Sequence, residues 1–489
     1  MNYPLMLESK VAAAGLLAIR SPFDGDLLAE AETGNVAHVE DALATAQALI
    51  RDRRAWLSIP KRIEILQKTA AAMSDRRDEL ALLAASEGGK PLADSAIEVT
   101  RAIDGMHLCI EALRTDPGRV IPVATTTASA GRLAFTQKEP IGVVAAVSAF
   151  NHPLNLIVHQ VAPAVASACP VIVKPAPDTP LSCLRFVQLL REAGLPNACC
   201  QVLVTDDAVT AEALVTDPRV AFFSFIGSAR VGWMLRSKLP PGTRCALEHG
   251  GAAPLILGDE FDFELAVAAV LKGGFYHAGQ VCVSVQRVFA PRDRAREFAE
   301  ALAAAAGKLR VGDPTDAATE VGPLIRRGEV TRVAGWVDEA VADGAELLCG
   351  GNSLSASCYA PTVLLEPPAD ARVSTLEIFG PVVCVYAYSD VNEAVTQANS
   401  LPTAFQAAVF SDNLDFAMDL FSRLDASAIM INDHTAFRDD AMPFAGLRES
   451  GLGTGGIPYT LHDMQIEKML VIRSGVGGKT PSAHRPAGK

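Results

Sequence analysis

Residues 141–174 read IGVVAAVSAFNHPLNLIVHQVAPAVASACPVIVK. An apolar run that is rich in β-branched residues, 141–148, precedes a helical pattern at 155–168, and a second apolar run follows at 170–174. Short apolar runs bounded by turn signals predict buried strands. A helix between two such strands is typical of a β-α-β unit, so this stretch predicts an α/β fold with a parallel sheet covered by helices.

The same alternation of patterns extends in both directions. It continues to residue 247, and a second α/β series begins after 252, which predicts two units joined near 248–255. Residues 36–114 show apolar residues at three- and four-residue spacing and are predicted to be helical. The β-branched runs of 119–147 predict strands or a long hairpin.

Composition excludes several classes of function. The chain has 489 residues, a charged fraction of 20% and a net charge of −13, with no basic block to attract nucleic acid or an anionic membrane. Its ten cysteines include no C-x-x-C pair and predict reduced thiols in the cytoplasm and no metal site. The longest apolar stretch, 161–173, is too short to span a bilayer.

Two stretches contain candidate catalytic residues, a glutamate before a glycine bend and an asparagine between a strand and a helix. In CALEHGG, 245–251, Glu248 ends a strand before a Gly-Gly bend and can present its carboxylate to a cleft. In VSAFNHPLN, 147–155, Asn151 lies between a strand and a helix, where its amide can donate to an oxyanion. A surface turn glutamate and an Asn cap are the alternatives that these residues leave open.

Two further stretches can hold a phosphate or a ribose. FSFIGSARVG, 223–232, joins a strand through Gly-Ser to a helix, an arrangement that binds phosphate with backbone N–H groups and a hydroxyl. In PVIVKPAPDTP, 170–180, Lys174 follows a buried strand at the carboxyl end, where α/β sheets bind ligands. The usual six-residue glycine fingerprint of dinucleotide folds is absent from the sequence.

A cysteine and two helical polar residues complete the candidates. Cys282 lies in FYHAGQVCVSVQR, 275–287, between a turn and a predicted strand, where nearby N–H groups can favour the thiolate. Asn155 and His159 are four residues apart and share one face of the predicted helix, which suggests a polar cavity wall. A buried structural cysteine and a core histidine are the alternatives.

Together, and in this order, these motifs resemble those of the aldehyde dehydrogenase superfamily over about residues 18–470. Glu248 and Cys282 are 282 − 248 = 34 residues apart, the interval that the family shows between its base and its nucleophile. The matching motifs are EGGKP (87–91), PIGVV (140–144), AFNHPL (149–154), KPAPDTP (174–180), AGLP (193–196), FIGSARVG (225–232), LEHGG (247–251), GQVC (279–282), GDP (312–314), VGPLI (321–325), EIFGP (377–381) and MPFAGLRESGLG (442–453).

The resemblance implies a Rossmann-like cofactor domain, an α/β catalytic domain and a small β oligomerisation arm. The NAD(P)-binding domain would comprise 1–117 and 140–247, and the catalytic domain 248–460. The arm and the C-terminal tail would comprise 118–139 and 461–489, with a last strand near 465–473. Separately, the Gly-, Pro- and Lys-rich composition of 475–489 predicts a loose tail. An arm of this kind implies a homodimer or homotetramer.

The resemblance also implies a reaction. Cys282 would attack an aldehyde to form a thiohemiacetal, and the Asn151 amide with the Cys282 N–H would hold its oxyanion. Loss of hydride to NAD(P)⁺ would leave a thioester, and Glu248 would activate the water that hydrolyses it to the acid.

The implied cofactor residues are Lys174, Gly227, Ser228, Glu377, Phe379 and Phe150. NAD-preferring relatives often carry an acidic residue where this chain has Pro177, so the cofactor is expected to be NAD or NADP with the preference open, and no arginine is obviously placed to attract the NADP phosphate. The base motif reads LEHGG where LELGG is usual, which puts His249 beside the base.

The substrate is expected to be a small polar or anionic aldehyde. Asn155 and His159 would line the aldehyde site, and NDHTAFRDDAMPFAG, 432–446, resembles members that oxidise lactaldehyde or other small hydroxylated or anionic aldehydes. Arg438 is a candidate to bind a carboxylate, phosphonate or sulfonate. The alternative is that Arg438 pairs with Asp439, Asp440 or a neighbouring loop and does not meet the substrate.

Three other functions remain open. A CoA-acylating aldehyde dehydrogenase would resolve the thioester with CoA, but such relatives generally lack the base that Glu248 provides. A dehydrogenase of an amino-acid semialdehyde would need a clamp for the α-amino and carboxylate groups. A catalytically silent binding or structural protein on the same fold is the alternative outside enzymes.

Overall fold

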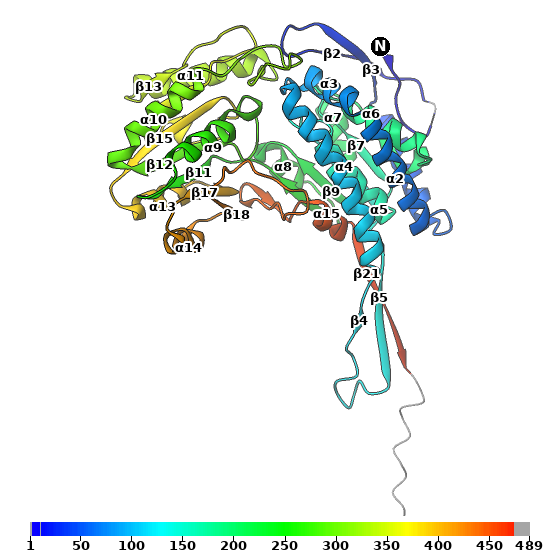
Figure 1. Cartoon of the computed structure of the whole chain (residues 1–489). Helices are drawn as coiled ribbons and strands as arrows, with labels where there is room; N and C mark the ends of the chain where they lie inside the picture. Colours follow the sequence, from blue (N-terminus) through cyan, green and yellow to red (C-terminus); the bar gives the residue numbers. More distant parts are fainter. Residues whose placement is uncertain (1, 10, 474–489) are drawn as a thin grey trace, which may run out of the picture.

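The computed structural model describes residues 2–9 and 11–473, and two large sheets with helices packed against them dominate it (Figure 1). The predicted α/β class is therefore confirmed. The predicted loose tail at 475–489 lies outside the described residues.

The first sheet has six strands, of which five are parallel and the sixth, β20, is antiparallel to β10. In order across the sheet they are β20 (Gly451–Leu452), β10 (Arg244–Glu248), β9 (Val220–Ile226), β6 (Val143–Val147), β7 (Val171–Lys174) and β8 (Cys200–Val202). The stretch 141–174 supplies the central strands β6 and β7 with α5 (Asn155–Ser167) between them, as predicted.

Strand β6 is buried along its whole length because helices cover both faces of the sheet. Val144 and Ala146 face one apolar core, whereas Val143, Ala145 and Val147 face another, as the two-residue period of a strand requires. The first core is formed with α2 (Ile59–Asp75), α3 (Arg77–Gly88), α4 (Leu92–Thr115), α5, α6 (Leu181–Glu192) and α15 (Ile457–Asp463). The second is formed with α1 (Val36–Arg51), α7 (Ala208–Val215) and α8 (Ala229–Arg236).

The second sheet has seven strands, all parallel except the edge strand β13. Across the sheet they are β13 (Glu346–Cys349), β14 (Thr362–Leu365), β15 (Val382–Tyr388), β12 (Val285–Pro291), β11 (Ala253–Leu257), β17 (Gln406–Phe410) and β18 (Ala428–Ile431). Its core is shared with α9 (Phe263–Phe275), α10 (Arg292–Ala306), α11 (Arg327–Ala342), α12 (Arg372–Thr375), α13 (Val391–Asn399) and α14 (Leu414–Arg423).

A narrow three-stranded sheet projects from the body of the molecule (Figure 1). It consists of β4 (Val120–Ile121), β5 (Arg132–Pro140) and β21 (Gln465–Arg473), and β5 and β21 pair along nine residues each. The sequence predicted strands in both of these segments. The arm has the place expected of an oligomerisation arm, and that role remains a prediction.

Short elements complete the described chain. They are β1 (Asn2–Tyr3), β2 (Gly15–Arg20) and β3 (Leu27–Thr33) in one sheet, β16 (Thr403–Ala404) with β19 (Leu447–Arg448) in another, and the 3₁₀ turns η1 (Asn197–Cys199) and η2 (Tyr276–Gly279). Within residues 2–9 and 11–473, no helix is both long and apolar enough to cross a membrane. The domain boundaries remain a prediction. One strand crosses the boundary predicted at 247/248, because β20 lies within 248–460 but pairs with β10 in the sheet of the preceding unit.

Candidate active site

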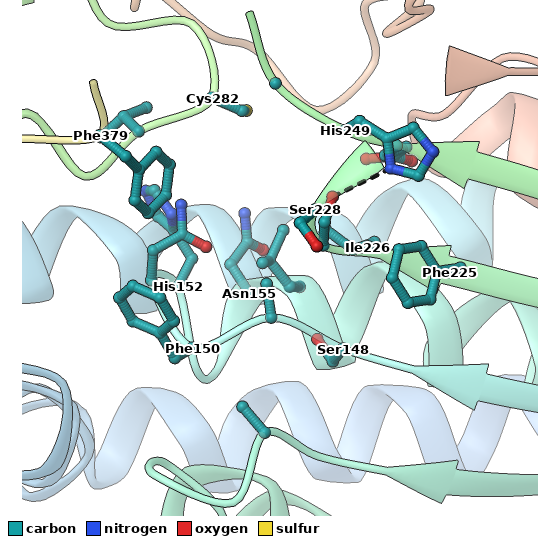
Figure 2. A pocket seen from close by; sticks show the side chains of 18 of the residues that line it. Ser148, Phe150, His152, Asn155, Phe225, Ile226, Ser228, His249, Cys282 and Phe379 are labelled. Carbon is teal, nitrogen blue, oxygen red and sulfur yellow. Dashed lines mark hydrogen bonds between the residues drawn. The ribbon is translucent and has the colours of Figure 1, made fainter. Parts of the chain in front are cut away.

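A cavity of about 420 Å³ lies where the two large units meet. Four neighbouring strands of the six-stranded sheet, β10, β9, β6 and β7, direct their carboxyl ends or the loops after them toward it. Every site residue predicted from the sequence lines this cavity: Cys282, Glu248, Asn151, Lys174, Gly227, Ser228, Glu377, Phe379, Phe150, Asn155, His159 and Arg438. Figure 2 shows Phe150 and Phe379 on one side and Ser228 with His249 on the other.

Cys282 lies in the turn between η2 and β12, so the predicted turn before the thiol is observed. The strand begins at Val285, three residues after the cysteine. The turn depends on Gly279, which has φ 69° and approaches Gly380 so closely that a Cβ would lie 2.0 Å from the Gly380 oxygen. A residue with a side chain would therefore displace the loop that carries Cys282.

Asn151 is held beside the cysteine loop. Its Nδ2 donates to the backbone oxygen of Gln280 at 3.0 Å, two residues before Cys282. Gln280 is itself fixed, because its Oε1 accepts from the Ile325 N–H at 2.9 Å and its Nε2 donates to the Pro323 oxygen at 3.2 Å. The amide of Asn151 thus has a defined position next to the loop of the thiol.

The carboxylate of Glu248 lies at the end of β10 and packs over Gly455, where a Cβ would be 2.0 Å from its Oε1. Burial raises the pKa of Glu248, while the charges of His159 and Arg438 act in the opposite direction. A carboxylate with a raised pKa is a better proton acceptor near neutral pH than an exposed one.

The Cys282 thiol has a raised pKa in this structure. Burial is the main cause, followed by the negative charges of Glu377 and Glu248, while Arg438 acts to lower it. The sequence predicted that nearby N–H groups favour the thiolate. The thiol's own backbone N–H does favour it, but burial and the two carboxylates outweigh that contribution.

The residues assigned to the cofactor include polar groups without a hydrogen-bond partner among the described residues. Burial raises the pKa of Glu377 to about 8, and its Oε1 has no hydrogen-bond partner among the described residues. Burial lowers the pKa of Lys174 to about 8. Ser228 occupies the N-cap position of α8 without a capping hydrogen bond, and neither its N–H nor its hydroxyl forms a hydrogen bond within 2–9 and 11–473. Phe150 and Phe379 pack edge to face with centroids 5.8 Å apart.

The predicted polar wall of α5 is present. Asn155 and His159 are both buried and both line the cavity, and Cys282 lies across the cavity from Asn155 (Figure 2). His159 Nε2 lies 2.8 Å from Oδ1 of Asp440. Asp440 also receives two hydrogen bonds from Arg101, at 2.7 and 3.1 Å, and these two partners hold the pKa of the carboxyl well below its usual range despite burial.

The environment of Arg438 agrees in part with the alternative to substrate binding: Arg438 contacts a neighbouring loop, but it forms no ion pair with Asp439 or Asp440 among the described residues. Asp440 pairs with Arg101 and His159, and no ion pair of Arg438 occurs in the described part of the chain. Nη1 donates to the backbone oxygen of Met442 at 2.9 Å, so the predicted contact with a neighbouring loop exists. The guanidinium lies over the Phe444 ring at 4.3 Å, and its Nη2 is buried without a partner.

Several residues at the cavity were missed from the sequence. Arg101 comes from α4 and Tyr276 from η2, and both line the cavity. Arg326 lines the end near Lys174, where its Nε donates to Oδ1 of Asp178 at 2.9 Å. An arginine is therefore present where none was expected. Tyr276 could have been identified, because it lies within FYHAGQVC, close to Cys282 in the sequence. Nothing in the sequence around Arg101 or Arg326 indicated that they line the cavity.

No cluster of three or more metal-ligating side chains occurs in the portion of the chain that the structure describes. The polar groups that line the cavity are a thiol, carboxylates, amides, imidazoles, hydroxyls and cations.

Comparison with known proteins identifies the family. The model of the aldehyde dehydrogenase family matches residues 11–470. The chain belongs to the aldehyde dehydrogenase family. The resemblance seen in the sequence motifs is thereby confirmed, as is the assignment to NAD(P)-dependent oxidoreductases that act on aldehydes.

Three similar aldehyde dehydrogenases show the extent of the match. The 3-sulfolactaldehyde dehydrogenase of Priestia aryabhattai is 36% identical over 445 residues, 91% of this chain and 92% of that protein. The lactaldehyde dehydrogenase of Methanocaldococcus jannaschii is 34% identical over 85% of this chain and 89% of its own length. The structure of aldehyde dehydrogenase 21 from Physcomitrella patens, in complex with the reaction product succinate, has a TM-score of 0.92 and 33% identity, covering 97% and 98% of the two chains.

Solved structures also bear on the cofactor of this aldehyde dehydrogenase. Two glyceraldehyde-3-phosphate dehydrogenases of the same fold, from Methanocaldococcus jannaschii and Bacillus halodurans, are complexed with NADP. Use of NAD or NADP is confirmed at the level of the family, with no preference between the two.

Proposed function

We propose that this protein oxidises a small anionic aldehyde to its carboxylic acid with NAD(P)⁺, using Cys282 as the nucleophile. One observation carries the proposal: Cys282, Glu248, Asn151 and Arg438 all line the same 420 Å³ cavity. The names of similar proteins support an anionic substrate, because sulfolactaldehyde and glyceraldehyde 3-phosphate carry a negative group and succinate is a dianion.

The residues of the cavity divide into two ends. Lys174, Gly227, Ser228 and Glu377 would hold the cofactor, and the polar atoms of Ser228 and Glu377 that lack a partner fit its phosphate and hydroxyl groups. When bound, NAD(P)⁺ supplies the acceptor for the hydride that leaves the substrate carbon. Asn155, His159 and Arg438 would surround the aldehyde at the opposite end.

At the reacting carbon, the Cys282 thiol gives up its proton to solvent as its sulfur forms a bond to the carbonyl carbon, and the carbon–oxygen double bond becomes a single bond with the negative charge on oxygen. The Asn151 amide and the Cys282 N–H would donate to that oxygen. Once the carbon is oxidised to a thioester, Glu248 takes a proton from water as the water oxygen attacks. The carbon–sulfur bond then breaks and releases the acid.

Arg438 would bind the anionic group of the substrate. Its Nη2 is a buried donor without a partner, which is costly unless a ligand satisfies it. The neighbouring Asp440 forms its hydrogen bonds with Arg101 and His159 and no ion pair with Arg438 among the described residues. An uncharged substrate such as lactaldehyde is the second candidate, and the lactaldehyde dehydrogenase relative favours it.

The test is the rate of reduced-nicotinamide formation with 3-sulfolactaldehyde and with lactaldehyde, with NAD⁺ or NADP⁺, and with or without CoA. We expect CoA-independent turnover that favours the sulfonate. In Arg438→Gln, kcat/KM for 3-sulfolactaldehyde should fall about 10- to 100-fold, the worth of a charged hydrogen bond, while lactaldehyde changes less than about threefold.

Arg310→Gln is the matched control, because Arg310 is an exposed arginine that does not line the cavity. Equal losses on both aldehydes in Arg438→Gln would refute the anion-binding role. Turnover that requires CoA would support the acylating alternative. A preference for long aliphatic or aromatic aldehydes would contradict the proposed substrate class.

A further inference from the structure

His249 occupies a slot that this chain leaves open for an imidazole. The side chain is only 2% exposed, and the rings of Phe225 and Trp233 lie 5.6 and 5.9 Å from it, centroid to centroid. The floor of the slot is Gly232 of α8, where a Cβ would lie 2.0 Å from Cε1 of His249. A larger residue at 232 would expel the ring, so the two positions fit each other.

The imidazole is bonded to the loop between β9 and α8. Its Nδ1 lies 2.9 Å from the backbone oxygen of Gly227, as Figure 2 shows. Because a carbonyl only accepts, Nδ1 carries the proton and donates it. The N–H of Gly227 in turn donates to the backbone oxygen of Glu248 at 3.0 Å. Residues 248 and 249 therefore hold both polar backbone atoms of Gly227.

This arrangement sets the direction of the next N–H group. The carbonyl of Gly227 and the N–H of Ser228 belong to one planar trans peptide group and point in opposite directions. With the carbonyl fixed toward His249, the Ser228 N–H is directed away from the imidazole. Ser228 lines the cavity, and its N–H has no partner in the described chain. It is the first free donor at the start of α8.

We propose that His249 is a positioning residue that aims the Ser228 N–H at the pyrophosphate of NAD(P)⁺. The inference rests on the proposed cofactor site and adds to it a residue that orients one of the phosphate-binding N–H groups. The family's usual leucine at this position has no donor with which to hold the loop. His249 also follows Glu248 directly, so one short segment carries the base and orients the phosphate loop.

Binding of ADP-ribose and of adenosine, measured by calorimetry, separates this role from a general structural one. His249→Phe keeps a planar ring without a donor, and His249→Leu carries the family's usual residue. We expect either variant to raise the Kd for ADP-ribose about three- to tenfold, the worth of one neutral hydrogen bond. The Kd for adenosine, which has no pyrophosphate, should change less than twofold.

His249→Asn supplies the rescue, because its side-chain N–H can replace Nδ1 as the donor and should restore most of the ADP-ribose affinity. Unchanged ADP-ribose affinity in His249→Phe and His249→Leu would overturn the inference. Equal losses for adenosine and ADP-ribose would also overturn it, because they indicate general damage to the site. Wild-type protein that binds neither ADP-ribose nor NAD(P)⁺ would refute the proposed cofactor site, and the role of His249 with it.

Discussion

The ionisation of single residues in the cavity depends on burial more than on their charged neighbours. Burial is the leading cause of the raised pKa of Cys282, Glu248 and Glu377. Three acidic groups that hold their protons more tightly lie around one cavity, which is typical of a site where proton transfer is part of the reaction.

The raised pKa of Glu377 predicts how the stability of the protein depends on pH. Its pKa in the folded protein is about 8, raised from 4.5 by burial. The folded protein thus holds this proton more tightly than the unfolded chain, so the contribution to stability is complete below pH 4.5 and is lost as the pH rises toward 8. The slope is at most about 1.4 kcal/mol per pH unit. We expect the Tm of Glu377→Gln, relative to wild type, to rise between pH 5 and pH 8.

Thermal unfolding at pH 5, 6.5 and 8 measures this difference. Glu264→Gln, which removes an exposed glutamate of α9, is the control and should keep a constant offset from wild type. A constant offset for Glu377→Gln as well would show that its carboxyl titrates normally.

At the residue scale, the sequence identified those groups that belong to contiguous motifs. Glu248 and Cys282 could be recognised because their neighbours in the chain are distinctive. Arg101 could not, because within its helical pattern it is one charge among several. It reaches the cavity through its pair with Asp440, which is 339 residues away.

Among the elements, α4 and α5 both contribute side chains to the cavity and are bonded to each other at the start of α5. Glu98 of α4 accepts hydrogen bonds from the N–H groups of Leu154 and Asn155, both at 2.9 Å, at the start of α5. Its other oxygen pairs with Lys90, and both side chains are fully buried. One carboxylate therefore fixes the end of the helix that carries Asn155 and His159.

Glu98→Gln is expected to destabilise the protein strongly. The variant leaves the Lys90 ammonium buried without a charged partner, which typically costs about 3–5 kcal/mol. Denaturant unfolding measures the loss, with Glu111→Gln on the exposed side of the same helix as the control. If both variants were equally stable, the buried pair would have no structural role.

The observed elements agree closely with the sequence patterns where the patterned segment is long. The helix predicted from 155–168 is observed at Asn155–Ser167, and the β-branched runs on either side form β6 and β7. The two-residue strand β20 was not predicted. A strand of that length has no period to detect, and its pairing with β10 is set by the tertiary fold.

At the scale of the whole molecule, the arm formed by β4, β5 and β21 leaves apolar side chains uncovered. Met469, Leu470, Val471 and Ile472 of β21 are 44–54% exposed, although consecutive residues of a strand point to opposite faces. Exposed apolar surface on an extended strand is typical of an interface. The expectation of a homodimer or homotetramer from the sequence is therefore retained as a proposal.

Leu470→Asp tests that proposal. A charge on the arm should weaken the association of subunits, so light scattering after gel filtration should give a smaller mass than for wild type. Leu354→Asp, at a similarly exposed leucine away from the arm, should leave the mass unchanged. A monomeric wild type, or a Leu470→Asp variant of unchanged mass, would assign the arm another role.

The most direct test of the proposed reaction is pre-steady-state formation of reduced nicotinamide by Glu248→Gln with 3-sulfolactaldehyde. Glutamine cannot accept the proton of water, so hydrolysis of the Cys282 thioester should slow about 10²- to 10⁴-fold while its formation continues. We predict a rapid burst of about one equivalent per subunit followed by near arrest, and neither phase in Cys282→Ala. Steady turnover of Glu248→Gln at the wild-type rate, or a burst that survives in Cys282→Ala, would contradict the account.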